Sequence, residues 1–113
     1  IPSISGDIDT GHSWNQFVIR ILDNDKLGSD VKTNKRDLFK LELQKYGVNT
    51  IIYYPIPIHL QPAYKKFGYV KGYLPITEKV CNQVISLPIF PGLTFIQQSY
   101  IVDTIKNIYE KHF

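Results

Sequence analysis

The chain has 113 residues, 43% of them hydrophobic and 13% aromatic, which suits one globular domain with a packed core. Thirteen basic and ten acidic residues give a formal net charge of +3, and without a recognition motif this charge does not argue for a nucleic-acid partner. Cys81 is the only cysteine, which excludes an internal disulfide, and no apolar run approaches the roughly 20 residues of a membrane helix. We therefore expect a soluble, cytoplasmic protein with no membrane partner.

The start of the chain predicts a piece of a longer protein. The sequence begins Ile1-Pro2 and contains no methionine. Residues 1–12 mix Ser, Gly and Asp without apolar periodicity and are typical of a linker. We expect the domain itself to occupy residues 13–113.

The first half of the domain predicts a strand, a helix and a second strand. Residues 14–22 are β-branched and aromatic, as in a strand, and residues 23–33 are an exposed connection. Asn34 is placed to cap a helix that Gly47 ends. The expected apolar face of this helix comprises Leu38, Phe39, Leu41, Leu43 and Tyr46. Residues 48–54 are predicted to form the second strand.

A proline-rich loop and a short helical turn follow. Pro55, Pro57 and Pro62 fix φ and exclude a continuous helix or central strand. Pro62 suits the first position of a short turn that ends at Gly68.

The second half predicts helix, strand and helix. Pro75 begins a helix with Ile76, Val80 and Val84 along one side. Residues 85–90 predict a strand, placed at a sheet edge or bulge by Pro88. Thr94 and Gln97 match a capping box before a final helix of about five turns. The residues predicted to line one side of this helix are Ile96, Tyr100, Ile101, Ile105, Ile108 and His112.

This order predicts an α+β fold. We expect a two-layer sandwich with a small, mostly antiparallel sheet and helices packed mainly on one face.

The strongest candidate for a binding site is the stretch from Asn49 to Phe67. Its Tyr53, Tyr54, His59 and Gln61 offer hydroxyl, imidazole and amide groups on a chain that proline has already stiffened. Three alternatives limit this hypothesis. His59 between apolar neighbours is more often structural than catalytic, and Tyr53 and Tyr54 on one strand would face opposite sides. Arg20 could bind a carboxylate or phosphate of a ligand, but it suits a partner within the chain at least as well. Glu78 suits support of the N-terminus of its own helix.

The sequence shows no complete set of catalytic residues or of metal ligands. The three histidines and Cys81 lack metal-ligand spacing. The sequence also has no glycine-rich phosphate loop, nucleophile elbow or paired-carboxylate pattern.

Several motifs together resemble one family. The run YPIPIHLQPAY at residues 54–64 is followed by Phe67-Gly68, then by SLP at 86–88 and PGLT at 91–94. With SWNQFVIR at 13–20, these motifs are similar to the C-terminal part of the DegT/DnrJ/StrS sugar aminotransferases. The resemblance implies the small C-terminal domain of an aminotransferase of fold type I.

The resemblance also implies a cofactor and partners. The full enzyme would use pyridoxal phosphate to move an amino group, usually from glutamate, to a keto sugar carried by a nucleotide, and would form a homodimer. The Schiff-base lysine belongs to a large domain earlier in such chains, and none of the eleven lysines here lies in its motif. We therefore expect no cofactor, no catalytic residue and no transamination in this chain alone.

The resemblance assigns the polar loop to the sugar. Tyr54, His59 and Gln61 match the family pattern, whereas Tyr53 and Asn15 stand where many members carry histidine. We expect these five residues to contact or shape the sugar pocket, with the sugar itself left open. The alternative is a free-standing domain that binds a small ligand or a protein.

Overall fold

The computed structural model describes residues 14–22 and 34–112, so the expected linker at 1–12 and the expected connection at 23–33 lie outside the described residues. The elements in chain order are β1 (Phe17–Arg20), α1 (Lys35–Lys45), the short 3-10 helices η2 (Ile58–Leu60) and η3 (Pro62–Phe67), α2 (Pro75–Cys81), β2 (Val84–Leu87) and α3 (Phe95–His112).

The sheet is smaller than predicted. β1 and β2 pair antiparallel, with Arg20 opposite Val84. The expected strand at 48–54 is wrong except for one bridge, in which Ile51 and Ser86 exchange both backbone hydrogen bonds at 3.1 and 2.7 Å. Beyond Ile51 two prolines lack N–H donors and restrict the residues before them, so the chain leaves the sheet.

β2 is one of the two strands of this small sheet. It pairs with β1 along one side and has only the single Ile51 bridge on the other, so the predicted edge position holds except at Ser86. The strand begins at Val84 and ends at Leu87, directly before Pro88. Proline therefore stops the pairing instead of marking a bulge within it.

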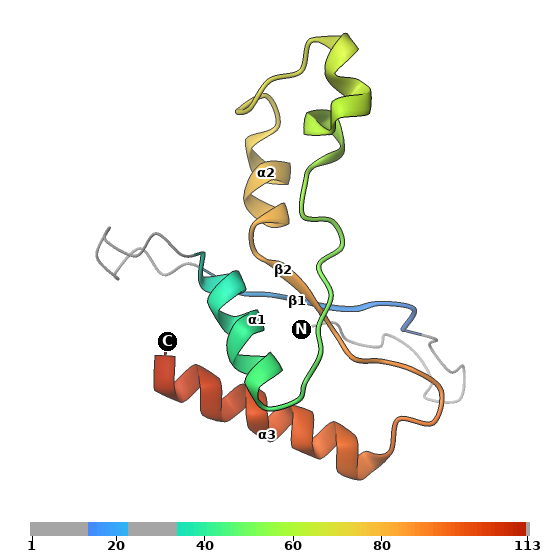
Figure 1. Ribbon diagram of the computed structural model, residues 1–113, viewed down its shortest axis with the longest axis vertical. Coiled ribbons are helices and arrows are strands. Elements are labelled where there is room, and N and C mark those ends of the chain that lie inside the picture. Colours follow the sequence, from blue (N-terminus) through green and yellow to red (C-terminus); the bar gives the residue numbers. More distant parts are fainter. Residues whose placement is uncertain (1–13, 23–33, 113) are drawn as a thin grey trace, which may run out of the picture.

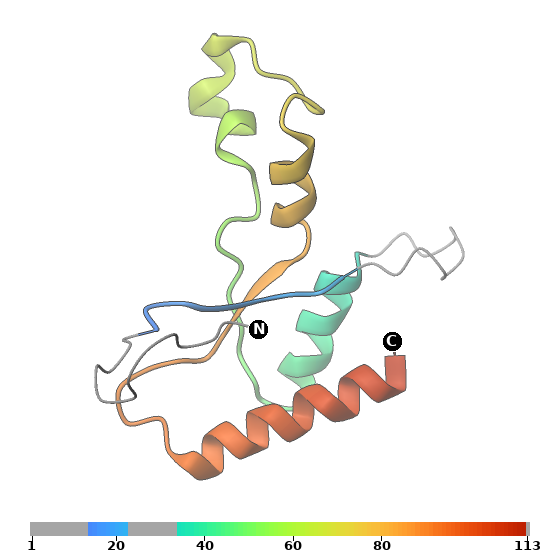
Figure 2. The same cartoon turned by 180° about the vertical axis from the view of Figure 1, so that it is seen from behind.

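The core lies where α1, α3 and β2 meet. Phe39 and Leu43 of α1, Ile85 of β2 and Ile108 of α3 are at most 2% exposed. α1 contacts both α3 and β2, and Figures 1 and 2 show α1 between the sheet and the long final helix. The α+β class predicted from the sequence is confirmed.

The helix faces are narrower than predicted. Leu41 and Tyr46 of α1 are 54% and 48% exposed, and Ile96 of α3 is 80% exposed. α3 extends beyond α1 at its N-terminal end (Figure 1), so only its later turns, with Thr104 and Ile108, are buried against the core. Val84 lies in β2 and not on the preceding helix.

The helix boundaries follow local chemistry, as predicted. The Asn34 side chain accepts the Arg36 N–H at 2.9 Å, and Gly47 ends the helix segment at a φ of +74°. Before α3, the Gln97 N–H donates to Thr94 Oγ1 at 3.2 Å while the Thr94 N–H donates to Gln97 Oε1 at 2.9 Å. This is the predicted capping box.

A buried arginine that the sequence analysis missed connects α1 to the start of β2. Arg36 is 5% exposed, and its Nη1 donates to the carbonyls of Cys81 and Val84 at 3.0 and 3.2 Å. These bonds satisfy the Cys81 carbonyl at the end of α2 and the Val84 carbonyl at the start of β2. The other arginine, Arg20, donates from Nε to the Gln83 side chain at 2.6 Å.

Residues 53–81 project from the body, and we call them the arm. The arm comprises the proline-rich loop, η2, η3 and α2, and both views show it extending away from α1 and α3 (Figures 1 and 2). Within the described residues, no helix combines the length and apolar character that crossing a bilayer requires.

Candidate functional site

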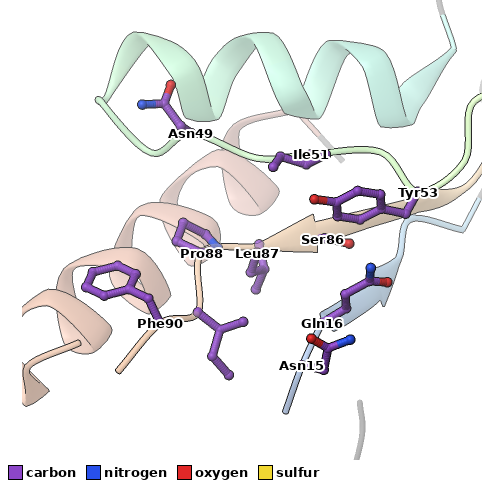
Figure 3. Close-up of a pocket in the computed structure, with 10 residues that line it drawn as sticks. Asn15, Gln16, Asn49, Ile51, Tyr53, Ser86, Leu87, Pro88 and Phe90 are labelled. Atoms are coloured by element: carbon purple, nitrogen blue, oxygen red, sulfur yellow. The ribbon is translucent and has the colours of Figure 1, made fainter. Parts of the chain in front are cut away.

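A polar pocket of about 280 Å³ lies beside the small sheet. Its wall comes from three segments: the residues before β1, the segment after α1 and the end of β2 (Figure 3). The Ile51–Ser86 bridge holds the last two segments together, and the antiparallel pairing of β1 with β2 adds the first. The lining residues are Asn15, Gln16, Asn49, Ile51, Tyr53, Ser86, Leu87, Pro88, Ile89 and Phe90.

The polar groups of this pocket are neutral. Asn15, Gln16, Asn49 and Tyr53 supply amide and phenol groups, and no acidic or basic side chain lines the pocket. Ser86 is 6% exposed, and its hydroxyl has no hydrogen-bond partner among the described residues. A buried hydroxyl without a partner is costly. The neutral amide and phenol groups suit a ligand rich in hydroxyl groups.

A second pocket, the tyrosine pocket, has a volume of about 510 Å³ and lies within the arm and against the sheet. Tyr53, Tyr54, Tyr69 and Tyr73 line it together with His59 and mostly apolar side chains. The rings of Tyr69 and Tyr73 lie 5.0 Å apart. Tyr53 lines both pockets and so connects the polar one to the aromatic one.

His59 and Glu78 form a buried pair beside the tyrosine pocket. His59 Nε2 lies 3.0 Å from Glu78 Oε1, and the same carboxylate accepts the backbone N–H groups of Gly72 at 2.8 Å and Leu74 at 3.4 Å. Burial acts to raise the pKa of Glu78, but the hydrogen bonds from His59, Gly72 and Leu74 outweigh it and lower the pKa. The ionised carboxylate therefore joins η2, the loop after η3 and α2.

This pair confirms two expectations from the sequence. His59 is 6% exposed and makes a structural hydrogen bond. Glu78 supports the first turn of α2, since it accepts N–H groups from the residues that precede that turn. The Nδ1 atom of His59 has no hydrogen-bond partner among the described residues.

Comparison with known proteins decides the family. Residues 2–106 match the DegT/DnrJ/EryC1/StrS aminotransferase family, which is nearly the whole chain. The chain belongs to this family. The resemblance carried by the sequence motifs is thereby confirmed.

Relatives and solved structures agree with this assignment. The chain is 42% identical over 83 residues to a pleiotropic regulatory protein of Geobacillus stearothermophilus, covering 74% of this chain and 22% of that protein. It is 33% identical over 103 residues to a dTDP-3-amino-3,4,6-trideoxy-alpha-D-glucose transaminase of Streptomyces venezuelae, covering 91% of this chain and 24% of the relative. The crystal structure of S. venezuelae DesV with a ketimine intermediate superposes with a TM-score of 0.70 at 33% identity, over 86% of this chain and 23% of DesV.

The chain thus spans about a quarter of the length of these DegT/DnrJ/EryC1/StrS relatives. Members of the family are aminotransferases that depend on pyridoxal phosphate, and the curated relatives include sugar transaminases. The chain therefore matches only a small part of each of these relatives.

The described residues do not fit the cofactor. Pyridoxal phosphate needs a lysine amine for its aldehyde and an acidic or basic partner for its ring nitrogen. Neither of the two pockets described above is lined by a lysine, an aspartate or a glutamate. We therefore derive no step of the reaction from this chain.

The structure distributes the five predicted site residues over two pockets. Asn15 and Tyr53 line the polar pocket, and Tyr53, Tyr54 and His59 line the tyrosine pocket. Gln61 lines neither pocket; it precedes η3, and its backbone N–H donates to the Ile58 carbonyl at 3.1 Å. The expectation that Tyr53 and Tyr54 face opposite sides is wrong, because the chain is not a strand there and both residues line the tyrosine pocket.

Apart from Asn15, the sequence analysis missed the polar residues outside the arm. Gln16, Asn49 and Ser86 line the polar pocket but were not predicted. Ser86 gave a usable signal, since it is the single hydroxyl in an otherwise apolar strand, VISL. Such a residue on a buried strand needs a hydrogen-bond partner or a ligand.

Proposed function

We propose that this chain is the sugar-contacting part of a nucleotide-sugar aminotransferase. In the full enzyme, an amino group would pass from glutamate to a keto sugar with pyridoxal phosphate as cofactor. The proposal rests on the 33% identity to a dTDP-sugar transaminase over 91% of this chain. The chain spans only 24% of that relative, which is why it is proposed as one part of such an enzyme.

The polar pocket supports a role in sugar binding. Its amide, phenol and hydroxyl groups match the hydroxyl groups of a sugar, and its lack of charge matches a neutral ring. We assign Asn15, Gln16 and Tyr53 to direct sugar contacts. Tyr54, His59 and Gln61 then shape the neighbouring arm.

Exposed apolar side chains on this chain support the proposal that other parts of the enzyme pack against it. Twelve large hydrophobic residues between Ile51 and Ile76 are at least 37% exposed. Apolar surface of this extent is typical of contacts with other protein parts. We infer that the cofactor-binding part of the enzyme and the second subunit of a homodimer cover it. A free-standing ligand-binding or interaction domain would need less of this surface.

The chain alone should not transaminate. The test is to add pyridoxal phosphate and glutamate to the purified chain and to follow conversion of the cofactor to its amine form by absorbance. The S. venezuelae transaminase serves as the active control. We expect the rate without protein and the rate with this chain to be equal. A rate above the protein-free mixture that saturates with glutamate contradicts the proposal.

A further inference from the structure

One long stretch of the sequence contains no charged side chain. All thirteen basic and ten acidic residues lie outside the stretch from Val80 to Val102, although charged residues make up 20% of the chain. The stretch includes β2 and the first turns of α3. Ile85 and Ser86 of β2 are buried, but the first turns of α3 extend beyond α1 (Figure 1). The absence of charge there therefore concerns a surface and not only the core.

Five large apolar side chains of this stretch are exposed, and we call them the α3 surface. Phe95 and Ile96, at the start of the helix, are 81% and 80% exposed. Tyr100 follows Ile96 by four residues and Val102 follows Phe95 by seven, so each pair lies along one stripe of the helix. The fifth residue is Phe90, which precedes the helix and is 51% exposed. Apolar surface of this kind is typical of a contact with another protein chain.

Two hollows lie beside these side chains. One has a volume of about 510 Å³ and is lined in part by Phe90, Ile96 and Tyr100. The other has a volume of about 420 Å³ and is lined in part by Phe90 and Val102. Phe95 lines neither hollow. A cavity of about 150 Å³ already holds a benzene molecule, so either hollow has room for a phenylalanine side chain from another chain.

These features point to one occupant. We propose that the α3 surface binds a second copy of this chain, in a two-fold contact that places Phe95 of each copy against a hollow of the other. In such a contact both chains use the same surface, which must therefore be complementary to itself. The α3 surface meets this condition because it offers a projecting ring and hollows together, and because it has no charge that an identical copy would repel.

The exposed area suits this occupant. With about 200 Å² for an aromatic side chain, the exposed fractions of the five residues give roughly 500 Å² of apolar surface on each chain. Two such surfaces in contact bury about 1,000 Å², which is the lower limit for a specific interface. The walls of the hollows add to this area.

This contact differs from those proposed for the full enzyme. α3 and the arm lie at opposite ends of the long axis of the chain (Figures 1 and 2), and the exposed apolar residues 51–76 belong to the arm end. A contact through α3 would therefore join two homodimers of the full enzyme into a tetramer. An anionic lipid surface is a poorer occupant, because it attracts basic residues and the stretch from Val80 to Val102 has none.

The test measures the mass of the purified chain by sedimentation equilibrium between about 1 and 100 µM, because dimer formation follows mass action. We expect a monomer–dimer equilibrium that approaches twice the 13.1 kDa of the chain. Ile96→Glu should raise the dissociation constant about tenfold or more, since it places a charge from each copy in an apolar interface. Salt should not weaken the dimer of the unmodified chain, because an apolar contact is not screened.

Ile76→Glu is the matched control. Ile76 is also the second residue of its helix and is 78% exposed, but it lies in the arm. Glutamate suits the first turn of either helix, and circular dichroism checks that both variants keep the fold. The control should dimerise as the unmodified chain does.

Three results would overturn the proposal. They are a chain that stays monomeric at the highest concentration, an equal effect of Ile96→Glu and Ile76→Glu, and the growth of larger species without a dimer. The assay contains no cofactor and no sugar, so its failure is distinguishable from a failure of the proposed aminotransferase function.

Discussion

The His59 imidazole donates from Nε2 to Glu78 Oε1 at 3.0 Å, and this contact joins two parts of the arm that lie nineteen residues apart in the sequence. An ionised carboxylate only accepts hydrogen bonds, so the shared proton lies on His59. The same carboxylate accepts the Gly72 N–H at 2.8 and 3.0 Å through its two oxygens. The tyrosine pocket therefore depends on one carboxylate for the position of its loop.

Acid should loosen the arm through Glu78. The pKa of this carboxyl is lower in the folded chain than its ordinary 4.5, because the hydrogen bonds of His59, Gly72 and Leu74 outweigh the effect of burial. A lowered folded pKa gives a contribution to stability that is complete above the unfolded value and is lost as pH falls through the folded value. The expected loss therefore begins below pH 4.5.

Hydrogen exchange of the Gly72 amide measures this loss. Its protection should decrease as pH falls below 4.5 in the unmodified chain, after correction for the intrinsic rate. Glu78→Gln should already show low protection at neutral pH and change little with acid. Equal pH profiles for the two proteins would show that Glu78 does not hold the loop.

Ile85 should be among the most sensitive positions in the core. Its side chain is fully buried between the helices and the sheet. Ile85→Ala should lower the free energy of unfolding by about 2–5 kcal/mol, because it removes buried methyl groups and leaves a cavity. Ile76→Ala is the matched control, since Ile76 is 78% exposed, and it should change stability by less than about 0.5 kcal/mol. Urea unfolding measures both, and similar midpoints would contradict the core as described.

Arg36 should stabilise the junction between the body and the arm. Arg36→Met keeps much of the apolar stem but removes the donors to the Cys81 and Val84 carbonyls. We expect a loss of about 2 kcal/mol or more, because these carbonyls lose charged hydrogen bonds. Lys106→Met, on the exposed face of α3, should be close to neutral in the same urea titration. If Arg36→Met left the free energy of unfolding unchanged, water would have to satisfy the Cys81 and Val84 carbonyls as well as the guanidinium does.

Asn15 should separate sugar binding from stability. Its side chain is exposed and lines the polar pocket, so Asn15→Ala should change the unfolding midpoint little. The variant should bind dTDP-glucose about fivefold more weakly and dTDP as before, since one hydrogen bond contributes about 1 kcal/mol. Calorimetry with both ligands checks this. Equal losses for the two ligands would place Asn15 outside the sugar contacts.

Local signals predicted the helices and their ends. Asn34, the Thr94–Gln97 pair and the segment from Pro62 to Gly68 act through neighbours in the sequence, and the structure has each of them as expected. The short-range chemistry of caps and turns needs no knowledge of the rest of the fold.

The sheet and the pockets depend on contacts between distant residues. Residues 48–54 have a strand composition, but only Ile51 pairs, because its partner Ser86 lies thirty-five residues away and prolines then redirect the chain. Arg36 was missed for the same reason, since its acceptors are the distant carbonyls of Cys81 and Val84. The sequence thus predicted Asn15 and Tyr53 as candidates for the polar pocket but not Gln16, Asn49 and Ser86, which line it with them.

The most direct measurement of the central claim is the activity of a chimera. This chain would replace the matching quarter of the S. venezuelae dTDP-sugar transaminase, and cofactor absorbance would confirm that the chimera folds. The account predicts amination of the dTDP-linked keto sugar with glutamate as donor, and no amination by the relative with that quarter deleted. A chimera that folds and holds the cofactor, yet neither binds nor aminates the nucleotide sugar, would contradict the account.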